Sequence, residues 1–228
     1  MKRFGLIGGM SWESTKEYYR LINERIRYLK GKHYSADCVL CSINFNEIES
    51  TIKKGEWERS NELLLEAATI LKNSKAEFIA ICSNTMHKCI PFIEEKINIP
   101  IVHIVDSTSN EIKRKGIRKA LLLGTKFTMN EDFNKKRFEM NGINIIIPNE
   151  KEQEIIDAVI FDELCKGIIN EESKKRYLDI IMKYCDLNTG VILGCTEIGL
   201  LIKKTDINIP VFDTTEIHAK EIAERGIL

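Results

Sequence analysis

Internal repetition of short apolar phrases is the feature of this sequence that most constrains its fold. Three phrases recur in the same order: residues 4–9 with 119–125, residues 78–85 with 190–197, and residues 98–108 with 208–215. Each phrase is a run of aliphatic residues that ends on glycine or a small polar residue, as a buried parallel strand does at its carboxyl end. Because the repeat is about half the chain long, it is too long for a solenoid and predicts two similar lobes.

The segments between the apolar phrases have helical periodicity. In residues 57–71, for example, Leu64, Ala68 and Leu71 share one face. Strands that alternate with helices predict an α/β protein in which each lobe is a small doubly wound parallel sheet. We expect residues 1–105 with 212–228 in the first lobe and residues 106–211 in the second. A pseudo-two-fold axis would relate the lobes, with the active site in the cleft between them.

Charge and length exclude several classes of protein. The 228 residues, 43% of them hydrophobic, can fill a sizeable core. Lys and Arg together number 34, as do Asp and Glu, so no net charge recruits nucleic acid or an anionic membrane. The apolar run at the amino terminus stops at Gly8, too early for a signal peptide or a membrane span, which predicts a cytoplasmic protein.

Seven cysteines, an odd number without framework spacing, predict reduced thiols. Cys38 and Cys41 form a lone C-x-x-C, for which zinc or redox chemistry is the alternative to burial in a strand. No second ligand pair follows, so we interpret them as buried strand cysteines. The sequence also lacks a phosphate-loop lysine motif and a cluster of metal ligands, and Gly8-Gly9 is a weak dinucleotide signal.

Two polar residues occupy matching places at the ends of repeated strands. Aligning the apolar runs sets Ser83 opposite Cys195. Two groups that flank a tetrahedral carbon can remove a proton from one face and return one to the other, which inverts the centre without a cofactor. A thiol can act as the base if positive charge, backbone N–H groups or a helix amino terminus stabilise its thiolate. From the residues alone, an inert buried Cys195 remains open.

Four ordered segments, residues 8–12, 83–87, 124–128 and 194–197, resemble the signature segments of the aspartate/glutamate racemase family. This resemblance implies a two-lobed, usually homodimeric enzyme that racemises amino acids without a cofactor. One catalytic residue maps onto Cys195. Where many members have a second cysteine, this chain has Ser83, as in members that prefer L-aspartate or L-glutamate. Cys82 is adjacent but should face the other way, because neighbouring strand residues alternate.

The resemblance also implies a set of substrate-binding residues. Side-chain and backbone donors for the α-carboxylate would come from Asn84, Thr85 and Thr196. Met10 and Ser11 would line the first-lobe wall, and Thr125 and Thr128 the second. Lys166 is the candidate for the distal carboxylate of an acidic substrate, with a solvated helix lysine as the alternative. Ile52 stands near a place where relatives carry a polar side chain, which leaves room for a broader substrate range.

The remaining polar residues near these segments have less certain roles. His87 can orient the first catalytic residue or be structural, and His33, His103 and His218 have no spacing that suggests a metal site. Glu197 can tune the protonation of Cys195 or cap the following helix. Because a serine is a poorer base than a thiolate, we predict that Cys195 deprotonates the L-enantiomer efficiently and that α-proton exchange into the D-enantiomer is slow.

Three alternatives to an aspartate/glutamate racemase stay open. One is a broad-specificity amino-acid racemase. Another is an isomerase or decarboxylase of small dicarboxylates that has the same fold and uses Cys195 alone. The third is a non-catalytic amino-acid sensor, in which Ser83 has silenced the chemistry. In each, the ligand is a small molecule, and no metal, nucleic acid or membrane is expected.

Overall fold

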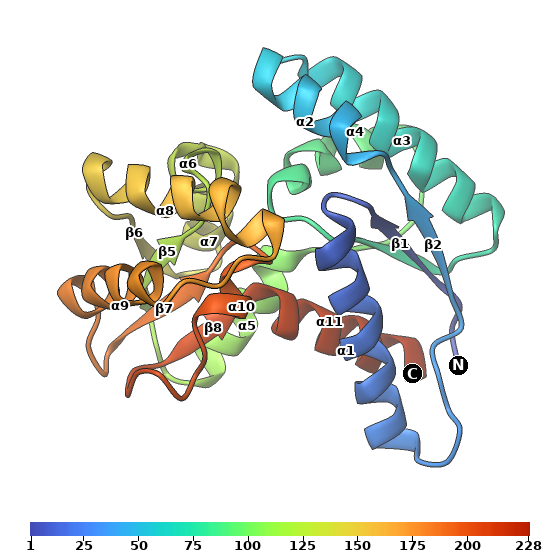
Figure 1. Ribbon diagram of the computed structural model, residues 1–228. Helices are drawn as coiled ribbons and strands as arrows, with labels where there is room; N and C mark the ends of the chain where they lie inside the picture. Colours follow the sequence, from blue (N-terminus) through green and yellow to red (C-terminus); the bar gives the residue numbers. More distant parts are fainter. The chain divides into compact units, whose positions relative to one another are not determined.

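A computed structural model describes residues 1–228, which divide into two compact units. Unit 1 comprises Met1–His103 together with His218–Leu228, and unit 2 comprises Ile104–Ile217. Each unit contains one four-stranded sheet with helices on its faces (Figure 1). No helix has the length and apolar character that crossing a bilayer requires.

The sheet of unit 1 is entirely parallel and has the strand order β2-β1-β3-β4. Its strands are β1 (Phe4–Gly8), β2 (Cys38–Ser42), β3 (Phe78–Ile81) and β4 (Ile101–Val102). Alternate residues of β1 serve opposite faces: Leu6 packs in one core layer and Ile7 in the other. Strands β1 and β3 are central and wholly buried, which explains their continuous apolar sequence.

Helices cover both faces of this sheet. On one face lie α1 (Trp12–Lys30) and the part of α11 (Thr214–Ile227) that belongs to unit 1, packed on Leu6 and Phe78 (Figure 1). The other face carries α2 (Phe45–Lys54), α3 (Trp57–Asn73), the 3-10 helix η1 (Thr85–Cys89) and α4 (Ile90–Lys96). The expected amphipathic helix over residues 57–71 is confirmed, with Leu64, Ala68 and Leu71 buried.

Unit 2 repeats this architecture, with the parallel strand order β6-β5-β7-β8. The strands are β5 (Lys119–Leu123), β6 (Asn144–Ile146), β7 (Thr189–Leu193) and β8 (Val211–Asp213). One face packs against α5 (Ile104–Arg114) and α7 (Asp132–Met140). The other packs against α6 (Lys126–Asn130), α8 (Glu150–Asp162), η2 (Leu164–Lys166), α9 (Glu171–Tyr184) and α10 (Ile198–Leu201).

The two sheets therefore have equivalent strand orders, and within each sheet all strands are parallel. β1, β3 and β4 of unit 1 correspond to β5, β7 and β8 of unit 2, the pairs that the repeated phrases predicted. The α/β fold class with two similar, doubly wound parallel sheets is confirmed.

The point at which the chain returns to unit 1 differs from our expectation of residue 212. Residues of β8 pair with β7, from Val191 with Val211 to Leu193 with Asp213, and Phe212 is buried in the core of unit 2. These contacts hold the segment in the second sheet, so the return comes at His218.

The seven cysteines form no disulfide. Cys38 and Cys41 lie on β2, as expected, but this is an edge strand and both residues are only half-buried. Burial is the main cause that raises the pKa of each thiol. Their environment is thus the opposite of that of a reactive redox pair, whose thiol pKa is lowered.

Candidate active site

The exit of β3 carries the first predicted catalytic residue. Ser83 is the second residue after the end of β3 and is 8% exposed. Asn84, also buried, and Thr85 follow it into η1. The Cys82 backbone N–H continues the ladder by donating to the Ile7 carbonyl at 2.8 Å, and the Cys82 side chain packs in the core beneath α1. Burial raises the pKa of Cys82, so this thiol does not offer an accessible thiolate in place of Ser83.

Three histidines gather behind Ser83. The Nδ1 of His87 is 2.7 Å from the Ser83 carbonyl oxygen, to which its N–H donates. The His87 ring meets the rings of His103 and His218 edge-on, with centroids 4.6 and 5.7 Å away. His87 thus holds the backbone of Ser83. The sequence did not anticipate this cluster, because its members are far apart along the chain.

The buried hydrogen bonds of His218 define its protonation state. Its Nε2 donates to the Val102 carbonyl at 2.9 Å, so Nδ1 is the acceptor for the Tyr18 hydroxyl, also at 2.9 Å. Full burial lowers the pKa of His218 to about 4, and the histidine is therefore neutral near pH 7. No group of three or more His, Cys, Asp or Glu side chains is arranged to hold a metal ion.

The loop between β1 and α1 positions Met10 and Ser11. Gly9 has a φ of 89°, and a Cβ there would lie 2.1 Å from the Ile43 carbonyl oxygen, so only glycine fits. The Gly9 N–H donates to the Thr15 hydroxyl at 2.8 Å, and the Ser11 hydroxyl caps α1 by accepting from the Ser14 N–H at 3.3 Å. Met10 packs in the core and Ser11 is buried.

In unit 2, the exit of β7 carries the second predicted catalytic residue. Cys195 is the second residue after β7 and is half-buried. Its thiol donates to Glu197 Oε2 at 3.1 Å, and the Thr196 hydroxyl donates to the same oxygen at 2.6 Å. Glu197 is 5% exposed. The buried carboxylate of Glu197 therefore holds the side chains of Cys195 and Thr196 by hydrogen bonds.

Within unit 2, the surroundings of Cys195 favour its protonated thiol over the thiolate. Burial, and after it the negative charge of Glu197, raise the pKa of Cys195 well above its ordinary value. The Glu197 backbone N–H acts in the opposite direction and is outweighed. Cys195 accordingly rests as a protonated thiol. The alternative of Glu197 as a helix cap fails, because its side chain makes no capping hydrogen bond to α10.

The exit of β5 places Thr125 and Thr128 beside this loop. The Thr125 hydroxyl caps α6, accepting from the Thr128 N–H at 3.1 Å, and the two hydroxyls are 3.1 Å apart. A Cβ on Gly124 would lie 2.9 Å from Thr128 Cγ2 and 3.3 Å from the Gly194 carbonyl oxygen. The two glycines allow the β5 and β7 exits to approach closely, so unit 2 brings Thr125, Thr128 and Cys195 to one sheet edge.

Lys166 lies in η2, the 3-10 helix that contacts α10. Its side chain is 59% exposed, and its Nζ is 3.5 Å from Asp162 Oδ1. The neighbouring Cys165, rather than Lys166, packs with Cys195 against the same core. In unit 1, Ile52 packs its half-buried side chain on the core beside α3. Within unit 2, the Lys166 ammonium group therefore lies at the surface, and within unit 1, Ile52 adds an apolar side chain rather than a charge.

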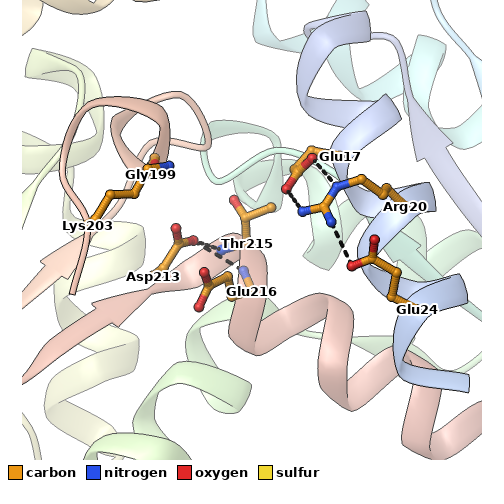
Figure 2. A network of polar contacts seen from close by, with 8 residues as sticks. All are labelled: Glu17, Arg20, Glu24, Gly199, Lys203, Asp213, Thr215 and Glu216. Carbon is orange, nitrogen blue, oxygen red and sulfur yellow. Dashed lines mark hydrogen bonds and ion pairs between the residues drawn. The ribbon is translucent and has the colours of Figure 1, made fainter. Parts of the chain in front are cut away.

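A second buried carboxylate, Asp213, ends β8. It accepts the backbone N–H groups of Thr215 and Glu216 at 2.8 and 3.1 Å and so caps the start of α11 (Figure 2). A Cβ on Gly199 would lie 2.2 Å from Asp213 Oδ2, which fixes glycine there. Burial raises the pKa of Asp213 to about 6. The sequence signal for this cap was the acidic residue directly before Thr214-Thr215.

These features define a class of protein: a duplicated parallel α/β fold in which a serine in one half and a cysteine in the other stand two residues beyond the equivalent strand. The profile of the Asp/Glu/Hydantoin racemase family matches residues 7–222. The chain belongs to this family, and as a racemase it is an isomerase.

Several relatives resemble the chain over its whole length. A crystal structure from Yersinia pestis, assigned as an Asp/Glu racemase, is 44% identical with a TM-score of 0.93, and both chains are covered completely. PH1733 from Pyrococcus horikoshii OT3, an aspartate racemase homologue, is 38% identical with a TM-score of 0.89, again over both whole chains. The broad specificity amino-acid racemase RacX of Bacillus subtilis strain 168 is 22% identical over 95% of this chain and 94% of its own.

Proposed function

We propose that this protein is a cofactor-independent racemase of L-aspartate or L-glutamate. In this proposal, Cys195 removes the Cα proton of the L-enantiomer and the Ser83 side returns a proton to the opposite face. Catalysis of this kind needs two proton-transferring groups on the two faces of one carbon.

The observation that carries the proposal is the equivalence of the two exits. Ser83 and Cys195 each stand two residues beyond the third strand of their sheet, and in both sheets that strand lies between the first and the fourth. A duplicated fold has therefore put a hydroxyl and a thiol at the same place in its two halves. That both flank one substrate carbon, on a pseudo-two-fold axis, stays a prediction.

Substrate binding in this proposal uses the polar groups around the two exits. Asn84 and Thr85 beside Ser83, and Thr196 beside Cys195, would hold the α-carboxylate. Because the Thr196 hydroxyl already donates to Glu197, it is the Thr196 backbone N–H that we assign to the substrate. The loops with Met10 and Ser11, and with Thr125 and Thr128, would form the walls.

The choice of amino acid rests on weaker features. Similarity to the Yersinia pestis and Pyrococcus horikoshii proteins favours aspartate or glutamate. The position of Lys166, exposed and paired with Asp162, and the apolar Ile52 favour a broader range, as does the likeness to RacX. We therefore keep broad-specificity racemisation as the second candidate. We also propose a cytoplasmic homodimer.

The proposal is tested by proton NMR of L-aspartate, L-glutamate and a neutral amino acid in deuterated buffer. We expect loss of the Cα–H signal of an acidic amino acid with wild type, no exchange with Cys195→Ala, and exchange without racemisation with Ser83→Ala. Cys41→Ala and Ser74→Ala are the matched controls and should retain wild-type rates.

Other outcomes of the same experiment identify the rivals. Faster exchange of the neutral amino acid would establish the broad range. Tight binding of an amino acid without any exchange would identify a sensor. Turnover of maleate or an arylmalonate, with every amino acid inert, would identify a dicarboxylate isomerase or decarboxylase.

A further inference from the structure

We propose that Asp213 and Thr214, at the exit of β8, are positioning residues that brace the Cys195 loop, residues 194–197, on both sides of Cys195. This role rests on the proposed function, in which the sulfur of Cys195 has to meet the substrate Cα at a fixed place. It adds two residues of the neighbouring strand exit to the site.

The first contact of this brace lies before Cys195. Strands β7 and β8 pair as far as their last residues, Leu193 and Asp213. Directly beyond, the Thr214 hydroxyl donates to the Leu193 carbonyl at 2.8 Å, and Thr214 is only 1% exposed. Such a buried hydrogen bond is costly to break, because water does not replace the lost partner. The β8 exit thus fixes the point at which the Cys195 loop leaves β7.

The second contact lies after Cys195, in α10. A Cβ on Gly199 would lie 2.2 Å from Asp213 Oδ2, so the carboxylate rests directly on the backbone of this helix. The neighbouring Ile198 donates its N–H to the Cys195 carbonyl at 3.1 Å, which ties α10 to the loop. A displacement of Asp213 therefore reaches Cys195 through one residue and one hydrogen bond.

Asp213 is itself held in place by α11. Its Oδ1 accepts the backbone N–H groups of Thr215 and Glu216 at 2.8 and 3.1 Å, and the side chain is buried (Figure 2). One carboxylate oxygen thus caps α11 while the other contacts α10. This carboxylate therefore holds the starts of the two helices together.

Unit 1 has a contact between the corresponding two positions. The repeated phrases align His103 with Asp213, while His87 and Gly199 each follow the predicted catalytic residue of their unit by four positions. The ring centroids of His87 and His103 are 4.6 Å apart, and His87 also donates to the carbonyl of that catalytic residue at 2.7 Å. Both units therefore support the loop beyond the third strand from the end of the fourth, although the residues differ.

The test compares the loss of Asp213 with the loss of another helix cap in unit 2. Asn149 caps α8 by accepting the Glu152 N–H at 3.1 Å. Both Asp213→Ala and Asn149→Ala should unfold at a lower temperature than wild type. Only Asp213→Ala should slow the α-proton exchange of L-aspartate and L-glutamate, by at least tenfold, because a small displacement of a reacting group removes much of the rate. Proton NMR in deuterated buffer gives this rate.

A second measurement does not depend on activity. Hydrogen–deuterium exchange followed by mass spectrometry should show at least tenfold faster amide exchange over residues 194–201 in Asp213→Ala, with no change in Asn149→Ala. Thr214→Val keeps the shape but loses the hydroxyl, so its amide exchange should be about threefold faster. Asp213→Asn keeps an acceptor for α11 and a similar shape, so both of its rates should stay within about threefold of wild type.

Gly199→Ala tests the same contact from the side of α10. The added methyl group collides with Asp213 Oδ2, so the α-proton exchange rate should fall at least tenfold. Once Asp213→Ala has removed the carboxylate, adding Gly199→Ala should change the rate less than twofold. This non-additivity would identify the contact between the two residues.

The proposal is overturned if Asp213→Ala is folded and keeps wild-type α-proton and amide exchange. It is also overturned if Asn149→Ala shows the same changes, since the loss of a helix cap then explains them. Should Asp213→Ala fail to fold, wild-type amide exchange in Thr214→Val and Gly199→Ala overturns it. If wild type exchanges no α-proton at all, the racemase proposal fails, while amide exchange over residues 194–201 still reports on the brace.

Discussion

The exits of β3 and β7 occupy the same place in two sheets of identical topology, yet they hold their key residues in different ways. At the β3 exit, a histidine holds the backbone carbonyl of Ser83. At the β7 exit, a carboxylate holds the Cys195 side chain itself. The comparison teaches that duplication of a fold preserves where a residue stands, while neighbouring side chains decide its chemistry.

The two regions also differ in which kind of ionisable group they bury. Behind Ser83 lies a buried neutral histidine, His218, whose pKa is lowered. Near Cys195, the buried groups are carboxylates, among them Glu197 and an Asp213 whose pKa is raised. Burial disfavours the charged form of both His218 and Asp213, but His218 is a base and Asp213 an acid.

The largest expected effect comes from making the β7 exit resemble the β3 exit. Cys195→Ser should lower the rate of α-proton exchange from L-substrate about 10³-fold, because an alkoxide is far harder to form than a thiolate. Deuterium incorporation followed by NMR measures the rate. Retention of more than a tenth of the wild-type rate would mean that the two exits are chemically interchangeable.

Opposite pH dependence of stability is the next expected effect. The carboxyl of Asp213 has a pKa of about 6 in the folded state against 3.8 ordinarily, so its stabilising contribution is complete below pH 3.8 and is lost as pH rises through about 6. Relative to Asp213→Asn, the free energy of unfolding of wild type should fall by roughly 2 kcal/mol between pH 4 and 7. Urea denaturation at several pH values tests this.

His218 should give the reverse slope. Its pKa is about 4 in the folded state against 6.5 ordinarily, so its contribution is present above pH 6.5 and is lost as pH falls through about 4. Relative to His218→Gln, the wild-type free energy of unfolding should fall by roughly 3 kcal/mol from pH 7 to pH 4. If the difference in unfolding free energy between wild type and variant changed with pH in the same direction for Asp213 and His218, the two regions would not differ in electrostatic character.

The reverse substitution, a cysteine in place of the serine at the β3 exit, should have a smaller effect. Ser83→Cys introduces a stronger base, so washout of the α-proton from D-substrate should become about tenfold faster. Initial rates of deuterium exchange into the D- and L-enantiomers give the measurement. Equal exchange rates for both enantiomers in wild type would already contradict the predicted asymmetry.

The smallest effect is expected at an exposed ion-pair network. Arg20 of α1 lies between Glu17 and Glu24 at the helix surface, with half of its side chain exposed (Figure 2). Arg20→Ala should cost about 0.5 kcal/mol of unfolding free energy and less at high salt, since water and ions screen the pairs. Thermal denaturation at two salt concentrations provides the comparison with the buried Asp213, whose effect salt should change little.

Much of the fold was predictable because the spacing of apolar residues along the sequence distinguishes buried strands from amphipathic helices. The runs that became β1, β3, β5 and β7 are continuous and apolar since both faces of each strand are buried. The helix α2 was missed, as was β6, a short and partly exposed edge strand without such a run. The exit positions of Ser83 and Cys195 followed from the same strand pattern.

The sequence by itself thus determined the duplicated strand order and which residues stand at the strand ends. Only the tertiary structure decided what surrounds them: three distant histidines behind Ser83, and a carboxylate turned toward Cys195 instead of its helix. The physical reason is that a local period specifies which residues are buried, whereas a protonation state depends on burial and on partners that other strands and helices bring.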